Sequence, residues 1–116
     1  MYKNFSNKEL SCSCGCGLMP SRVPMARLIM LRERFGKPMV ITSGARCEKH
    51  NNKVGGAKSS YHLAGAAFDV RLPNKNDLPE FISLAYKNGF RGIGVINQDK
   101  GVIHIDCRDK PIWIKY

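Results

Sequence analysis

The chain has 116 residues, which is the size of one ordinary domain. Hydrophobic residues make up 43% of it, enough for one modest core, so a fully disordered chain is excluded. Nineteen Lys and Arg residues against nine Asp and Glu residues give a formal net charge of +10. This charge suits an anionic partner such as a wall polymer, although it also fits an ordinary solvated surface. No stretch approaches the roughly 20 apolar residues of a membrane span, and no nucleic-acid-binding motif is present, so we expect neither.

The first half of the chain begins with a polar segment rich in Cys and Gly over residues 1–17, which we interpret as an N-terminal arm. Apolar residues then recur at roughly helical spacing over residues 21–35, which predicts a helix. Ser21 can cap this helix and Gly36 can end it. The β-branched run over residues 39–42 predicts a buried strand. Residues 43–60 have loop composition, with room for one short helix over 47–52.

The second half reads as alternating strands and one helix. A strand is predicted over residues 66–71, and a helix over residues 77–87, with acidic residues in its first turn. Two further strands, over 92–96 and 102–107, flank a five-residue hairpin loop. The sum is an α+β fold, with about two main helices packed on a small, largely antiparallel sheet.

Five cysteines are present, namely Cys12, Cys14, Cys16, Cys47 and Cys107. The first three form a C-x-C-x-C pattern, which is not the common C-x-x-C spacing of zinc sites. With Cys47 as a fourth ligand they could still hold a metal ion. The alternative is that the cysteines are reduced and packed as small apolar groups, or form one incidental disulfide. The sequence leaves both interpretations open.

Two of the three histidines stand in a context that favours metal binding. His62 precedes Asp69 by seven residues, and His104 lies within a run of Ile and Val. A polar side chain in such a strand needs a partner or a metal to offset its desolvation. Two His and one carboxylate are a ligand set of catalytic zinc, with one position left for water. The alternative is that both are hydrogen-bonded core histidines.

The motif around these residues resembles a known family. Residues 60–69 match the pattern S-x-H-x-x-G-x-A-x-D, which is similar to the zinc D-alanyl-D-alanine carboxypeptidase family. That family includes vancomycin-resistance dipeptidases and phage L-alanyl-D-glutamate endolysins. Residues 41–46, with Asn51, resemble the segment that carries the family's arginine, and residues 103–106 resemble the segment of its last ligand. The resemblance covers most of residues 5–108 and implies a fold of the hedgehog/D-Ala-D-Ala-peptidase type.

Carried over by position, the resemblance implies that His62, Asp69 and His104 bind Zn²⁺. It places Arg46 beside the metal, where a guanidinium can bind the substrate carboxylate or polarise the scissile carbonyl. Ser60 would either hydrogen-bond the substrate or fix its own loop.

The general base is where this sequence departs from the family. Several members carry an acidic residue three positions before the last histidine, where this chain has Gly101. Two replacements are available. Asp99 lies five residues before His104, and Asp106 lies two residues after it, on the same face of the strand. Asp106 could instead orient the ligand histidine. Of the two, we favour Asp99 as the base.

The resemblance therefore implies one zinc metallopeptidase domain over residues 1–116 that cleaves a peptide bond in peptidoglycan. D-Ala-D-Ala carboxypeptidase and L-Ala-D-Glu endolysin activities are both open. We expect a monomer that binds the peptidoglycan stem peptide. The N-terminus shows no signal peptide, so we expect synthesis in the cytoplasm and action at the wall after phage-type release, or on a virion. The alternative is a non-catalytic, zinc-containing wall-binding module on the same fold, because relatives in animal signalling keep fold and metal without clear peptidase activity.

Overall fold

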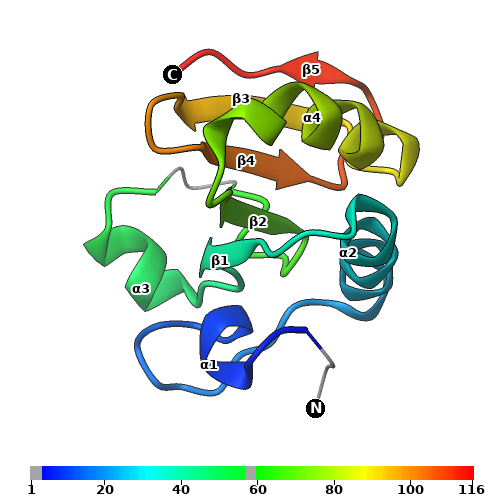
Figure 1. Cartoon of the computed structure of the whole chain (residues 1–116). Coiled ribbons are helices and arrows are strands. Elements are labelled where there is room, and N and C mark those ends of the chain that lie inside the picture. The colour runs from blue at the N-terminus through cyan, green and yellow to red at the C-terminus, as the bar shows by residue number, and fades with distance from the viewer. Residues whose placement is uncertain (1–3, 57–59) are drawn as a thin grey trace.

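A computed structural model describes residues 4–56 and 60–116. It contains helices α1 (Asn7–Leu10), α2 (Arg22–Phe35), α3 (Glu48–Lys53) and α4 (Leu78–Lys87), with a 3₁₀ turn, η1 (Lys75–Asp77), before α4. The strands are β1 (Val40–Ser43), β2 (Ala67–Arg71), β3 (Gly92–Asn97), β4 (Val102–Asp106) and β5 (Ile112–Trp113). The predicted α+β class is confirmed (Figure 1). Each predicted element lies within one or two residues of its expected bounds.

The strands form one five-stranded sheet in the order β1-β2-β4-β3-β5. The first four strands pair antiparallel, and only the short β5 runs parallel to its neighbour β3. The pairing of β2 with β4 is regular over its whole length and sets Asp69 opposite His104. The sequence therefore brings two distant segments together at the middle of the sheet.

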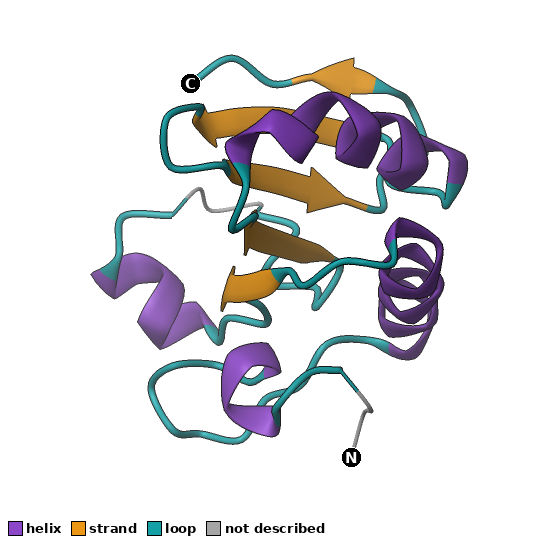
Figure 2. Ribbon diagram, in the orientation of Figure 1, coloured by secondary structure: helices purple, strands orange, loops and turns teal. Residues whose placement is uncertain are grey.

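The two faces of the central strands have opposite character. Phe68 and Val70 of β2, with Ile103 and Ile105 of β4, are completely buried in the hydrophobic core. The main helices α2 and α4 pack together beside this sheet (Figure 2). Phe35 and Phe81 meet between them in an edge-to-face contact, with 5.3 Å between ring centroids. Because side chains alternate along a strand, the residues between these apolar positions point to the other face. That second face carries the polar site.

Helix α2 begins and ends where the sequence predicts, but Ser21 acts differently from the expected cap. Its side chain makes no capping bond to the helix, and its hydroxyl instead donates to the carbonyl of Ala64 at 2.7 Å. Ser21 therefore ties the start of α2 to the loop that precedes β2. At the other end, Gly36 adopts a left-handed conformation with φ of 70°, which favours glycine as the terminating residue.

The N-terminal arm is part of the core. Phe5 and Leu10 are 3% and 0% exposed and belong to the main apolar cluster. Ser6 and Glu9 form a reciprocal capping box at the start of α1. The second carboxylate oxygen of Glu9 accepts a hydrogen bond from the backbone N–H of Ile41 at 3.0 Å. The arm is thus fastened to strand β1.

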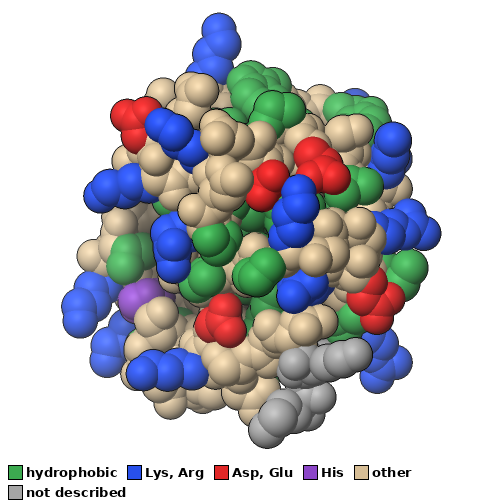
Figure 3. Space-filling view, viewed as in Figure 1, with side chains coloured by type: hydrophobic (Ala, Val, Ile, Leu, Met, Phe, Trp, Pro, Cys, Tyr) green, Lys and Arg blue, Asp and Glu red, His purple; other side chains and the backbone are tan. Residues whose placement is uncertain are grey.

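The surface and the C-terminal segment complete the fold. The N–H of Ile114 donates to the carbonyl of Ile93 at 2.8 Å, which continues the contact of β5 with β3. Lys and Arg side chains are scattered over the face seen in Figure 3, with acidic side chains between them. No helix in the described parts of the chain is long and apolar enough to cross a membrane.

Candidate metal centre

Three ligand atoms converge on the polar face of the sheet. Oδ1 of Asp69 lies 3.0 Å from Nδ1 of His104, its partner across β2 and β4, and 3.3 Å from Nε2 of His62. Both histidines are buried, and the side chain of Asp69 is 14% exposed. The structure therefore brings together all three residues that the sequence predicts as metal ligands.

His62 comes from the loop before β2, and its ring is held by the backbone. Its Nδ1 lies 2.7 Å from the carbonyl oxygen of Gly44. A carbonyl can only accept, so Nδ1 carries a proton, and Nε2, which faces Asp69, is the nitrogen left to bind a metal. The carbonyl of His62 also accepts hydrogen bonds from the N–H groups of Arg46 and Gly65, at 3.0 and 3.1 Å. Gly65 has a φ of 65°, which lets the loop turn sharply into β2.

His104 is oriented from behind by a buried carboxylate. Its Nε2 donates to Oδ2 of Asp106 at 2.7 Å, so Nδ1, which faces Asp69, is the nitrogen left to bind a metal. Asp106 is completely buried, and both of its oxygens accept hydrogen bonds from the guanidinium of Arg108, at 2.8 and 2.6 Å. Arg108 in turn lies over the ring of Tyr61, 4.6 Å from its centroid. Asp106 therefore acts on the site through His104.

The ionisation of these groups follows from their contacts. Burial alone would raise the pKa of Asp69, but the hydrogen bonds of His104 and His62 outweigh it and hold the pKa well below its usual range. Burial likewise opposes the effect of Arg108 and His104 on Asp106, whose pKa is also well below the ordinary value. Burial lowers the pKa of His104, yet its contacts with Asp106 and Asp69 raise it overall. Both carboxylates are ionised at neutral pH.

This donor set fits a zinc ion. Its three ligand atoms all lie within 4.8 Å of one another. Two ligand atoms at about 2.0–2.1 Å from a tetrahedral zinc are about 3.3 Å apart, close to the separations of Asp69 from His62 and His104. Each histidine has its outward nitrogen bound to an acceptor, which is the arrangement that orients metal-binding imidazoles. Two imidazole nitrogens and a carboxylate facing one point suit a divalent cation, which takes the place of the proton that each imidazole directs at Asp69.

Arg46 lies beside this centre. One terminal nitrogen of its guanidinium is 3.3 Å from Oδ2 of Asp69, the oxygen on the far side from the histidine contacts. Its Nε donates to the hydroxyl of Ser43 at 3.1 Å, and its other terminal nitrogen donates to the side-chain carbonyl of Asn51 at 3.3 Å. Asn51 is 1% exposed, so it forms a buried support. Three fixed contacts give the guanidinium one orientation.

The centre opens into a pocket of about 470 Å³. The predicted ligands share its wall with two arginines, two tyrosines and several small or apolar residues. The lining residues are Arg46, Gly55, Gly56, Ser60, Tyr61, His62, Asp69, Ile96, His104, Arg108, Ile114 and Tyr116.

The sequence of the chain also matches the model of a known protein family. The sequence model of the family described as Peptidase M15 matches residues 3–106, which is most of the chain. The chain belongs to the peptidase M15 family. The resemblance to the zinc D-Ala-D-Ala carboxypeptidases is thus confirmed, and the peptidases of this M15 family depend on zinc. A search of the curated proteins finds no match.

The two acids proposed as the base of this M15 protein occupy very different places. Asp99 lies in the turn between β3 and β4, its side chain is 94% exposed, and its carboxylate is 4.0 Å from Nζ of Lys75. The structure does not bring Asp99 to the pocket. Asp106 is bound to His104 and Arg108, which is the orienting role that the sequence left as its alternative. Among the described residues that line the pocket, Asp69 is the one carboxylate.

Ser60 lines the pocket, and its hydroxyl accepts a hydrogen bond from the N–H of His62 at 3.2 Å. This contact corresponds to the expected role of fixing the loop. The substrate-binding role stays a prediction.

Sequence reasoning missed Arg108, Tyr61 and Tyr116 as parts of the site. His104, Asp106 and Arg108 follow one another at every second position, and this spacing was the available signal for Arg108. Tyr116 lines the pocket, with its ring centroid 6.4 Å from that of His104. Burial and the charges of the nearby carboxylates raise its pKa, so its hydroxyl keeps its proton. No local pattern marks this contact.

Proposed function

We propose that the protein is a zinc-dependent peptidase that hydrolyses a peptide bond in peptidoglycan. One observation carries the proposal: a three-residue ligand set, His62, Asp69 and His104, lies in the wall of an open pocket. Structural zinc sites are closed by four protein ligands, whereas catalytic zinc keeps three and one open position. Membership of the M15 family supports this reaction class.

Each part of the site has a role in this proposal. His62, Asp69 and His104 would hold the zinc ion, which would polarise a scissile carbonyl and acidify a water molecule. Arg46 binds the anionic end of the peptide, because its guanidinium is held in place beside Asp69. Asp106 keeps the tautomer and direction of His104 constant.

The proposed substrate is the peptidoglycan stem peptide, which carries free carboxylates. The pocket offers two guanidinium groups, from Arg46 and Arg108, and the whole chain carries a net charge of +10. Both features favour an anionic peptide near the centre. Cleavage at D-Ala-D-Ala and at L-Ala-D-Glu are the two specificities that we propose to compare.

The fold type that we propose is that of hedgehog and the D-Ala-D-Ala peptidases. The site of action that we propose is the cell wall, reached by phage-type release or on a virion, by a monomer.

A specific observation supports a second candidate function, a zinc-containing module that binds wall peptides without cutting them. The family's acidic residue is replaced by Gly101, and the described lining of the pocket offers no carboxylate besides Asp69. Proton transfer by a positioned base contributes typically about 10²- to 10⁴-fold to a rate. A site without such a base would keep its affinity for the peptide and lose most of its turnover.

Digestion of purified peptidoglycan and synthetic stem peptides separates the two functions. The chain is incubated with zinc, with a chelator, and with the chelator followed by zinc, and the products are read by mass spectrometry. The peptidase proposal predicts cleavage at one bond, its loss with the chelator and its return with zinc. The matched control is the His62→Ala, His104→Ala double variant, which should release no product. Zinc-dependent binding of the peptides without any product would establish the second function instead.

A further inference from the structure

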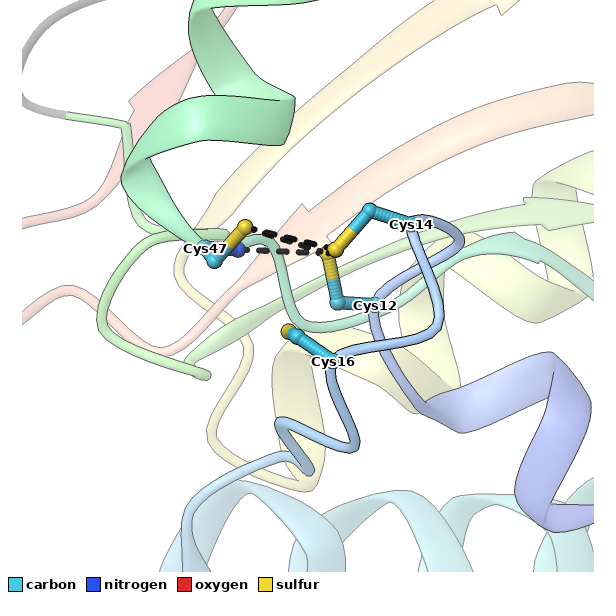
Figure 4. Close-up of side chains that lie close together, drawn as sticks. All are labelled: Cys12, Cys14, Cys16 and Cys47. Atoms are coloured by element: carbon cyan, nitrogen blue, oxygen red, sulfur yellow. Dashed lines mark hydrogen bonds between the residues drawn. The ribbon is translucent and has the colours of Figure 1, made fainter.

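A second group of metal-binding side chains lies outside the His/Asp/His centre. Cys12, Cys14 and Cys16 of the arm meet Cys47, which immediately precedes α3 (Figure 4). Three separations between sulfur atoms are 3.4 Å for Cys12–Cys14, 3.5 Å for Cys14–Cys47 and 3.7 Å for Cys12–Cys47. The sulfur of Cys16 completes a group in which all four lie within 4.8 Å of one another. The four thiols thus surround one point.

We propose that these four cysteines hold a structural zinc ion that fastens the N-terminal arm to the segment carrying Arg46. Four sulfur ligands at about 2.3 Å from a tetrahedral zinc are about 3.8 Å apart, close to the separations between Cys12, Cys14 and Cys47. A Cys₄ set is a closed coordination shell and leaves no position for substrate. The ion would therefore act on stability and position.

The backbone of the arm is shaped to present three sulfurs from five consecutive residues. The N–H of Cys12 donates to the carbonyl of Leu18 at 2.9 Å, which closes the segment into a loop. Within it, the N–H of Gly15 donates to the carbonyl of Cys12 at 3.1 Å. Gly15 and Gly17 both have a φ of 86°, a conformation that side chains disfavour. These turns explain how a C-x-C-x-C pattern, unlike the common zinc spacing, directs its thiols to one point.

Backbone N–H groups also point at the sulfur atoms. The N–H of Cys47 lies 3.3 Å from the sulfur of Cys12, and the N–H of His50 lies 3.4 Å from the sulfur of Cys47. Such donors favour the thiolate, which is the form that binds metal.

A single disulfide accounts for the arrangement less well than an ion does. A disulfide joins two sulfurs at about 2.0 Å and would leave the other two thiols without a role. Here all four cysteines are free thiols, and the sulfurs of Cys12, Cys14 and Cys47 are spaced almost equally. The fifth cysteine, Cys107, does not belong to the group.

The position of the cluster gives the ion a consequence for the pocket. Cys47 is the next residue after Arg46, whose guanidinium contacts Asp69. The N–H of Ala45 also donates to the carbonyl of Leu10 in the arm, at 3.0 Å. A zinc ion bound by the arm and by Cys47 would hold the segment after Arg46 to the arm, as the Ala45–Leu10 hydrogen bond holds the segment before it. Loss of the ion should therefore loosen Arg46 without removing any ligand of the His/Asp/His centre.

Metal counting on the full chain tests the proposal. The purified protein, dialysed against zinc and then against buffer, should contain two zinc ions per chain by elemental analysis. The Cys14→Ser, Cys16→Ser double variant should contain one, while the matched Cys107→Ser variant keeps two. The His62→Ala, His104→Ala double variant should also contain one, so the two sites are counted separately. If the Cys14→Ser, Cys16→Ser variant contained as much zinc as the wild-type chain, the proposal would be overturned.

Thiol reactivity gives a readout that needs no variant to fold. In the zinc-loaded chain, Cys12, Cys14, Cys16 and Cys47 should resist alkylation, and a chelator should expose all four, as peptide mass spectrometry can show. Replacing zinc with Co²⁺ should add a sulfur-to-cobalt charge-transfer absorption that the Cys14→Ser, Cys16→Ser chain lacks. Equal alkylation of the four thiols with and without chelator would contradict the proposal, and so would a disulfide among them in the purified protein.

Discussion

Asp69 on β2 and His104 on β4 are direct cross-strand partners, and a carboxylate oxygen of the first lies 3.0 Å from a ring nitrogen of the second. The register of the two strands places these residues side by side, so two of the three ligands are positioned by the sheet. His62 is the ligand that depends on a loop, and the carbonyl of Gly44 holds its ring. The centre is therefore held by paired strands on one side and completed by a loop residue on the other.

Removing both histidines should remove this zinc ion and leave the fold intact. The His62→Ala, His104→Ala variant keeps one carboxylate at the centre, which is too few ligands for a zinc site of this class. We expect it to lose one equivalent of zinc per chain by elemental analysis. His50→Ala is the matched control, because His50 lies on α3 outside the cluster, and it should keep the wild-type zinc content. Unchanged zinc in the double variant would refute the assignment of these ligands.

Asp106 should control zinc affinity through His104. Asp106→Asn keeps the shape of the side chain but removes the charge that His104 and Arg108 contact. Loss of such an outer partner typically weakens metal binding about 10- to 100-fold, which competition with a chromogenic chelator can measure. Asp99→Asn is the matched control, because Asp99 is exposed and should leave zinc affinity unchanged.

The same pair of variants tests the sequence-based expectation that Asp99 is the general base. From its position in the structure we expect Asp99→Asn to hydrolyse stem peptides at the wild-type rate, measured on samples of known zinc content. A loss of about 10²- to 10⁴-fold with zinc retained would assign the base to Asp99 after all.

Gly92 should be needed for the orientation of Asp106. A Cβ at position 92 would overlap with Oδ1 of Asp106 and Nε of Arg108, both of which face this point of β3. We expect Gly92→Ala to push this ion pair aside. Its zinc affinity should fall about 10- to 100-fold, as we expect for Asp106→Asn. Combining the two substitutions should then add little, because both act through one contact. Fully additive losses would show that Gly92 acts by another route.

The strands and main helices could be predicted from the sequence because each carries its own periodic pattern. The alternation of Phe68, Asp69 and Val70 in β2, and of Ile103, His104 and Ile105 in β4, indicates which side chains share a face. It does not say which residue of one strand lies opposite which residue of the other. The pairing of Asp69 with His104 joins residues that are 35 positions apart in the sequence, so no local pattern predicts it.

The remaining parts of the site depend on contacts that leave a weak local pattern or none. β5 has only two residues, both exposed, so no alternation marks it, yet its pairing with β3 brings Tyr116 to the pocket. Arg108 lies beyond the end of β4, and its role appears only once the buried carboxylate of Asp106 is known. The burial of the arm could not be predicted from the sequence, because α1 has four residues and is too short to show a helical repeat of apolar positions.

Leu10 offers a direct test that the arm belongs to the core. Its side chain is completely buried, so Leu10→Ala should lower the free energy of unfolding by about 2–5 kcal/mol in urea denaturation. Leu18, in the same arm, is 39% exposed, and Leu18→Ala should cost far less. Equal effects of the two substitutions would mean that the arm is not packed as described.

Arg46 should determine the preference for an anionic peptide. Its guanidinium is held by Ser43, Asn51 and Asp69, so a lysine cannot reproduce its three directed contacts. A hydrogen bond to a charged group is worth about 1.5–3 kcal/mol, so Arg46→Lys should lower kcat/KM about 10- to 100-fold on a peptide with a free carboxylate. Zinc content should stay at the wild-type value, because Arg46 is not a ligand.

Two controls separate this role from a general loss of structure. On the same peptide with its carboxylate converted to an amide, wild type and Arg46→Lys should differ little, since the charge that Arg46 recognises is gone. Arg71→Lys, an exposed arginine on the same strand as Asp69, should behave as wild type on both peptides. If Arg46→Lys reduced hydrolysis of the acid and the amide equally, Arg46 would act on the scissile carbonyl. That result would transfer recognition of the carboxylate to Arg108, the other guanidinium in the pocket.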